Sequence, residues 1–193
     1  MAPRRRETFA ERRERRAAVD DPAVVLEAAT RFLEARSRSV AEVRRRLSTA
    51  GYRAELIDGA ITRLAELGVL DDEAFARGWV ESRDRARPRG ERALRDELRL
   101  KGIDRAVVDD VLGDRRELRA NEGEDNEGSP DRLAALRLIE RHARTLDRID
   151  DPRKRRERAY ALLARNGFDP DICREVAARA ATVDPELDAG LPT

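Results

Sequence analysis

The segment Leu98-Arg-Leu-Lys-Gly-Ile103 contains a pattern, Leu-x-x-x-Gly-apolar, that recurs with matched flanking residues at two further places in the chain. The other copies are Leu47…Gly51-Tyr52 and Leu163…Gly167-Phe168. Apolar or small residues also recur eight positions before each glycine and five, six, nine and ten positions after it. They are Val43, Leu56, Ile57, Ala60 and Ile61; Leu94, Val107, Val108, Val111 and Leu112; and Ala159, Ile172, Cys173, Val176 and Ala177. Three copies with matched flanks indicate an internal repeat.

Each of these glycines predicts the end of a helix. Helices commonly end with glycine in the left-handed conformation, where a side chain is penalised. The apolar residue that follows then folds back onto the helix. We expect the next helix to begin near Arg53, Asp104 or Asp169. The two acidic starters would interact favourably with the positive end of that helix.

Each repeat also has an earlier helix. Residues 25–33 carry apolar side chains at helical spacing, and Ser39 with Glu42 forms a capping box that opens the next helix. In the third repeat we expect helices over 133–143, 153–165 and 170–181. Because no segment alternates as a strand would, the sequence predicts an all-α, elongated array of three tandem three-helix repeats, with nine helices.

The distribution of charge and apolar residues suggests the domain boundaries. Residues 1–20 hold seven arginines and four acids without apolar periodicity, and residues 113–131 hold three basic and seven acidic residues. We therefore expect a flexible basic tail over 1–22, repeats over 23–69, 70–113 and 131–182, an acidic linker over 114–130, and a flexible acidic tail over 183–193. Residues 119–130 are expected to lack regular structure.

Composition excludes several classes of protein. The chain has 193 residues, of which 42% are charged and 4% aromatic, and its net charge is +1. No apolar run reaches the roughly 18 residues of a membrane span, and residues 1–16 lack the apolar stretch of a secretory signal. The single cysteine, Cys173, cannot form an internal disulfide, so a cytoplasmic location is expected. One histidine and one cysteine make a zinc site of the usual type implausible.

No catalytic motif is present in the sequence. His142 shares a helical side with Leu138 and Ile139, which indicates a partly packed structural histidine. Cys173 occupies a repeat position held elsewhere by apolar residues, which indicates a core side chain. Asp71-Asp72 stand at a helix start, where capping is a simpler role than metal binding.

The basic residues are the remaining functional candidates. Residues 83–101 hold eight basic residues against four acids, and residues 132–165 hold eleven against five. One interpretation is a solvated surface paired with nearby acids at helical spacing. The other is contact with phosphates or an acidic protein surface. The candidates for binding a filament or DNA are Arg44, Arg45, Arg83, Arg87, Arg89, Arg95, Lys101, Arg153, Lys154, Arg155 and Arg156.

With these residues in view, the repeats resemble the RecX family, the bacterial regulators of the RecA recombinase. The resemblance rests on Arg36 to Leu47, Leu64 to Ala76, Gly90 to Ile103 and Ala159 to Phe168. It implies a curved row of three-helix repeats and a monomer that binds RecA and its nucleoprotein filament, restrains its activity, and can contact DNA within it. It also implies no cofactor and no enzymatic activity. One departure is the acidic insert at 121–130, which lengthens the glycine spacing from 51 to 65 residues.

Two further functions stay open at the level of the sequence. Three-helix units also resemble helix-turn-helix domains, so the chain could be a direct DNA-binding module that does not involve RecA. The candidate helices have few asparagines or glutamines among their arginines, which disfavours sequence-specific base reading. An RNA- or protein-binding scaffold is the third hypothesis.

Overall fold

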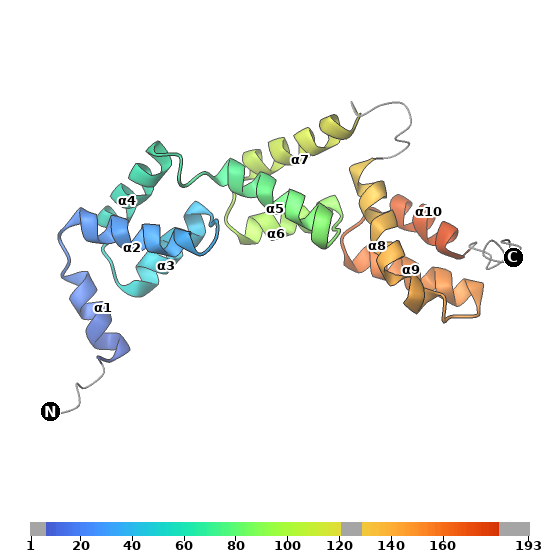
Figure 1. Cartoon of the computed structure of the whole chain (residues 1–193), viewed down its shortest axis with the longest axis horizontal. Helices are drawn as coiled ribbons and strands as arrows, with labels where there is room; N and C mark the ends of the chain where they lie inside the picture. The colour runs from blue at the N-terminus through green and yellow to red at the C-terminus, as the bar shows by residue number, and fades with distance from the viewer. Residues whose placement is uncertain (1–6, 121–128, 182–193) are drawn as a thin grey trace, which may run out of the picture. The chain divides into compact units, whose positions relative to one another are not determined.

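The computed structural model describes residues 7–120 and 129–181, and this part of the chain contains ten helices and no strand (Figure 1). The helices are α1 (Phe9–Ala17), α2 (Pro22–Glu34), α3 (Val40–Ala50), α4 (Ala54–Glu66), α5 (Asp72–Ala86), α6 (Glu91–Leu100), α7 (Arg105–Ala120), α8 (Pro130–Leu146), α9 (Pro152–Arg165) and α10 (Pro170–Ala181). The all-α fold is therefore confirmed. Helices α2–α4, α5–α7 and α8–α10 correspond to the three predicted repeats.

The chain divides into two compact units, and each is described by itself. Unit 1 consists of Met1–Arg77 and Leu98–Val108, and unit 2 of Gly78–Glu97 and Asp109–Thr193. The division falls within α5, α6 and α7.

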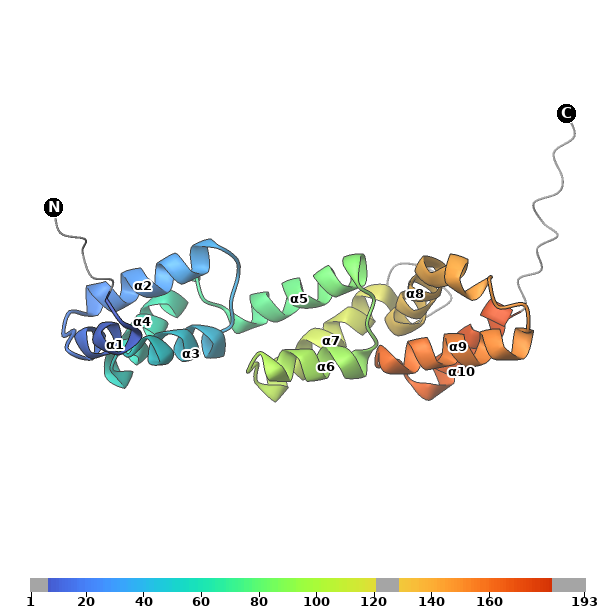
Figure 2. The same cartoon turned by 90° about the horizontal axis from the view of Figure 1, so that it is seen from below.

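The core of unit 1 lies among α2, α3 and α4, which pack against one another. Its buried residues are Val25, Ala29, Val43, Leu47, Ile57, Ala60, Ile61, Leu64 and Leu70. Apart from Leu70, all of these lie on the inner faces that the apolar spacing predicted. Helix α1 packs on α3 beside this core (Figure 2). It contributes no buried residue of its own.

The core of unit 2 includes α8, α9 and α10, which also pack together. One cluster contains Ala134, Ala135, Leu138, Leu163, Phe168, Cys173 and Val176, and a second contains Leu146, Ala159 and Ala177. The leucines one turn before the repeat glycines, Leu47, Leu98 and Leu163, are 2%, 0% and 0% exposed. All three are therefore core residues, as the repeat predicted.

The three repeat glycines end their helices in the predicted conformation. Their φ angles are 104° at Gly51, 79° at Gly102 and 81° at Gly167. The carbonyl of the preceding leucine accepts a hydrogen bond from the N–H of the apolar residue after each glycine. The N···O distances are 3.3 Å to Tyr52, 3.2 Å to Ile103 and 3.4 Å to Phe168. The same turn geometry therefore occurs in all three repeats, and it occurs again after α4, where the N–H of Val69 lies 3.0 Å from the Leu64 carbonyl.

Two predicted boundaries are wrong. The expected tail over 1–22 contains α1, because Thr8 and Glu11 form a capping box that fixes its first turn. The expected linker over 114–130 begins too early, because α7 continues to Ala120 through good helix formers such as arginine, glutamate and leucine. At the far end of the linker, Ser129 caps α8 and Pro130 begins it. Residues 121–128 and the predicted acidic tail over 183–193 lie outside the described residues.

Candidate interaction surface

Several candidate cations of the second repeat are paired within their own unit. Arg83 donates from Nε to Glu97 at 2.7 Å, and its guanidinium lies 4.2 Å from the ring centre of Trp79. Trp79 donates to the same carboxylate at 2.8 Å. Arg89 places Nε 3.2 Å from the other oxygen of Glu97 and also donates to the Asn166 side chain. Arg83 therefore connects α5 to α6, and Arg89 connects α6 to the end of α9.

Arg95 is held between two carboxylates. It donates to Glu91, one turn earlier on α6, at 2.9 Å and to Asp109 on α7. The hydrogen bond from Arg95 to Asp109 is the largest cause of the raised pKa of Arg95. A cation stabilised in this way by its own chain has less to gain from an external anion.

Lys101 joins the turn after α6 to the start of α3. Its ammonium donates to Glu42 Oε1 at 2.8 Å, and its carbonyl accepts from Ser39 Oγ at 2.6 Å. Burial by itself raises the pKa of Glu42, but Lys101, the Ser39 N–H and the charge of Arg36 outweigh it and lower the pKa. The Glu42 side chain is only 9% exposed, so this contact is structural.

The start of α5 also contacts the start of α3 in unit 1. Asp71 accepts from the N–H groups of Glu73 and Ala74, which confirms its predicted capping role. Asp72 accepts from the N–H of Val40 at 2.8 Å, and burial raises the pKa of Asp72. The start of α5 therefore satisfies a free donor in the first turn of α3.

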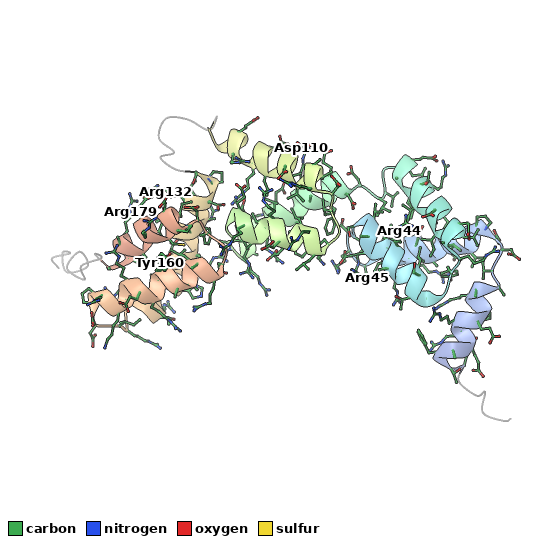
Figure 3. All side chains as sticks on the ribbon, turned by 180° about the vertical axis from the view of Figure 1, so that it is seen from behind. Arg44, Arg45, Asp110, Arg132, Tyr160 and Arg179 are labelled. Carbon is green, nitrogen blue, oxygen red and sulfur yellow. The ribbon has the colours of Figure 1, made fainter. Side chains whose placement is uncertain are left out.

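Four of the candidate cations have no partner within the described part of the chain. Among the residues that the structure describes, the side chains of Arg45, Arg87, Lys154 and Arg156 are exposed and form no hydrogen bond or ion pair. Arg45 lies on α3 beside Arg44, which is paired with Asp58 (Figure 3). Unpaired, exposed cations are the ones available to phosphates or to an acidic protein surface.

Helix α9 carries the largest group of such cations. Lys154 and Arg156 lie near its start, whereas Arg153 is 3.6 Å from Glu157 and Arg155 donates to the Ile149 carbonyl. Sequence reasoning missed three further exposed residues of this helix, Arg158, Tyr160 and Arg165. Tyr160 follows Arg156 by one turn and is 37% exposed (Figure 3). That spacing, readable in the sequence, would have identified it.

A buried cation of unit 2 also escaped the sequence analysis. Arg115 on α7 is 8% exposed and donates to both oxygens of Asp84, at 3.0 and 2.8 Å, and to Asp131 at 2.6 Å. Asp131 also accepts from the N–H of Glu91 at 2.7 Å. This cluster holds α5, α6, α7 and α8 together. It does not indicate a ligand-binding site.

A cavity of about 440 Å³ lies beside this cluster in unit 2. Its basic lining residues, Arg92, Arg95, Arg115 and Arg116, face Glu91, Asp131 and Asp169. The three carboxylates balance three of the four cations, and the lining holds no nucleophile paired with a base. The cavity therefore does not resemble a catalytic site.

The residues considered for catalysis have structural positions. His142 places Nδ1 2.9 Å from the Leu138 carbonyl of its own helix. Cys173 is buried, and burial raises the pKa of its thiol. No group of three His, Cys, Asp or Glu side chains suited to a metal ion occurs within 7–120 and 129–181. In the same part of the chain, no helix has the length and apolar character to span a membrane.

Comparison with known proteins identifies the three repeats. Family models described as RecX, first, second and third three-helix domains match residues 26–64, 71–112 and 134–177. The chain is 34% identical over 149 residues to "Regulatory protein RecX" of Mycobacterium sp. (strain JLS), which covers 76% of this chain and 75% of that protein. It is 36% identical over 146 residues to the protein of the same name from Mycobacterium avium (strain 104), covering 76% and 78%.

The fold agrees with a solved structure. The crystal structure of RecX from Lactobacillus salivarius superposes with a TM-score of 0.67 at 21% identity, covering 83% of this chain and 97% of that one. This comparison supports the tandem arrangement of three-helix repeats. Because the family models match all three repeats and the mycobacterial relatives match 76% of the chain, this chain belongs to the RecX family of regulatory proteins.

Proposed function

We propose that this chain is a non-enzymatic regulator that binds the RecA recombinase and its nucleoprotein filament and restrains recombinase activity. The observation that carries the proposal is membership of a family whose relatives are named regulatory proteins. The protein acts without a cofactor and as a monomer in this proposal. Its contacts are electrostatic, because the exposed and unpaired side chains of the candidate set are cations.

The structure narrows the candidate contacts. Arg83, Arg89, Arg95 and Lys101 are engaged with carboxylates of the same chain, so breaking those pairs to bind a partner would cost stability. Arg45, Arg87, Lys154 and Arg156 bear no such cost. We therefore assign partner contact first to these four, with Arg158, Tyr160 and Arg165 as additional residues on α9.

Inhibition of RecA-dependent strand exchange tests this assignment. The double variant Lys154→Ala/Arg156→Ala is compared with Arg31→Ala/Arg63→Ala, which removes two exposed cations that are paired with Glu27 and Glu66. Both variants lose two positive charges. Each lost contact of an exposed charge contributes about 0.5–1 kcal/mol, so the α9 variant should need roughly 5- to 30-fold more protein for half-inhibition. Equal inhibition by both variants would overturn the α9 assignment.

Direct DNA binding is the alternative, and the unpaired cations on three-helix units favour it as a second candidate. Binding to naked DNA and to RecA–DNA filaments should be measured over a range of salt concentrations. If phosphates are the partners, the logarithmic salt slope becomes shallower by about 0.7–0.9 per lost contact. Equal affinity for naked DNA and for the filament would favour the DNA-binding module over the recombinase regulator.

A further inference from the structure

The glycine turns of the second and third repeats each meet the start of an earlier helix. A Cβ at Gly102 would lie 2.3 Å from the Cβ of Ala41 on α3, and a Cβ at Gly167 would lie 2.4 Å from that of Ala93 on α6. The carbonyl before each glycine also accepts a hydrogen bond from that helix start. Lys101 accepts from Ser39 Oγ at 2.6 Å, and Asn166 accepts from the Gly90 N–H at 3.0 Å.

The glycine turn of the first repeat is covered as well, but by the second half of α1 and not by the start of a helix. We call Ala50, Gly51 and Tyr52 the docking turn. A Cβ at Gly51 would lie 2.5 Å from Arg13 Cγ and 2.8 Å from the Arg13 carbonyl oxygen of α1. The Ala50 carbonyl accepts from Arg16 Nη1 at 3.5 Å, and the Arg16 guanidinium lies 5.7 Å from the ring centre of Tyr52.

Helix α1 also begins as α3 does. Thr8 and Glu11 form a capping box, as Ser39 and Glu42 do. Figure 2 shows α1 beside α3, as expected for a helix that contacts its C-terminal turn. We propose that α1 is a terminal capping element that occupies, on the first repeat, the surface on which the later repeats receive a helix from the repeat before.

The contact made by α1 differs from the other two in its strength. Arg13 replaces the small alanines Ala41 and Ala93, and α1 buries no residue. Its hydrogen bond to the turn, at 3.5 Å, is longer than the two equivalent bonds. The docking turn is therefore an interaction surface held by a weakly attached segment of the same chain.

The third repeat lacks the alanine that contacts a glycine turn in the other two repeats. Ala41 lies ten residues before Gly51, and Ala93 lies nine before Gly102. The residues ten and nine positions before Gly167 are Glu157 and Arg158, so the third repeat has no alanine at the equivalent position. Release of α1 should leave a monomer.

The full-length chain tests this proposal through two matched pairs of variants. Gly51→Ala strains the turn and displaces Arg13. Gly68→Ala is the control, because it also strains a residue of positive φ, but its added Cβ would have no atom within 4 Å. Arg16→Gln removes the contacts to Ala50 and Tyr52, whereas Arg12→Gln changes an exposed residue of α1. Amide exchange over 9–17 and the rate of chymotrypsin cleavage after Phe9 in α1 are measured, with the oligomeric state by light scattering.

We expect faster exchange and cleavage in Gly51→Ala and Arg16→Gln, and no change in the two controls. A nine-residue helix is unstable alone, so its release should raise the rates roughly tenfold or more. Equal protection of α1 in Gly51→Ala and Gly68→Ala would overturn the proposal, and so would self-association of Gly51→Ala. If Gly51→Ala does not fold, the arginine pair decides by itself. These readouts do not involve RecA and stand apart from the proposed function.

Discussion

The contact between the Gly102 turn and α3 in unit 1 and the contact between the Gly167 turn and α6 in unit 2 share a geometry but differ in chemistry. Both bring a glycine against an alanine, and both satisfy the carbonyl before the glycine. In unit 1 the donor is the Ser39 hydroxyl, and a lysine–glutamate pair reinforces it. In unit 2 the donor is a backbone N–H. The steric contact between glycine and alanine is thus common to both units, whereas the charged groups around it differ.

The unit 2 contact also depends on a buried cation, Arg115, whereas the buried charge at the unit 1 contact is an anion, Glu42. Asp131 accepts from the N–H of Glu91, one residue after Gly90, and Arg115 neutralises Asp131 together with Asp84. In unit 1 the equivalent reinforcement is the half-buried Lys101 with Glu42. We therefore expect unit 2 to be the more sensitive of the two to loss of a single cation.

Replacement of Arg115 should have the largest effect. Arg115→Met leaves two partly buried carboxylates without their cation, and loss of one partner of a buried pair typically costs about 3–5 kcal/mol. Urea unfolding followed by circular dichroism measures the change. Arg116→Met is the control, because the Arg116 side chain is 59% exposed and should contribute less than about 0.5 kcal/mol. Equal costs for the two variants would mean that the buried cluster does not stabilise unit 2.

Double-mutant cycles at the two glycines compare the steric contacts directly. Gly102→Ala and Gly167→Ala should each lower the free energy of unfolding by about 2–4 kcal/mol. Alanine is disfavoured in the left-handed conformation, and its Cβ would make a close contact. At Gly102 the obstacle is the Cβ of Ala41, since the Cα is 3.9 Å away. Adding Ala41→Gly should therefore recover about 1–2 kcal/mol.

The same rescue should fail in unit 2. A Cβ at Gly167 would also lie 2.6 Å from the backbone nitrogen and 3.0 Å from the Cα of Ala93. Ala93→Gly leaves these atoms in place, so the coupling between Gly167→Ala and Ala93→Gly should be close to zero. Comparable rescue at both sites would show that the backbone in unit 2 relaxes and that the two contacts are equivalent.

The sequence predicted what depends on local conformation. A glycine after Leu-x-x-x marks the end of a helix wherever it occurs, so Gly51, Gly102 and Gly167 were identified without a structure. The apolar positions around them followed from helical spacing. The first helix was missed, although Thr8-x-x-Glu11 is a capping box in the sequence, because α1 has no apolar periodicity and no buried residue.

The pairing of the cations could not be predicted in the same way. Lys101 and its partner Glu42 lie 59 residues apart, and Arg115 reaches Asp84 and Asp131 across 31 and 16 residues. Helical spacing identifies partners three or four residues away, and these pairs depend on tertiary packing instead. As a result, candidate cations that looked alike in the sequence divide into structural and unpaired groups.

The smallest effect concerns pH and the lysine–glutamate pair of unit 1. The pKa of Glu42 is lowered in the folded chain from its ordinary value of 4.5. A lowered pKa means that Glu42 contributes stability above about pH 4.5 and loses it as the pH falls through the folded value. The free energy of unfolding of wild type should therefore exceed that of Glu42→Gln by about 1 kcal/mol at pH 7.

That difference should shrink steadily below pH 4.5, because protonated glutamate and glutamine are both neutral. Lys101→Met should reduce the pH dependence of the same difference, since Lys101 supplies the hydrogen bond and the charge that favour the ionised form of Glu42. Unfolding at several pH values, with Glu42→Gln measured in both backgrounds, separates this pair from all other titrating groups. A constant difference between pH 3 and pH 7 would mean that Glu42 stabilises unit 1 through its capping geometry alone, and that charge adds nothing to the unit 1 contact.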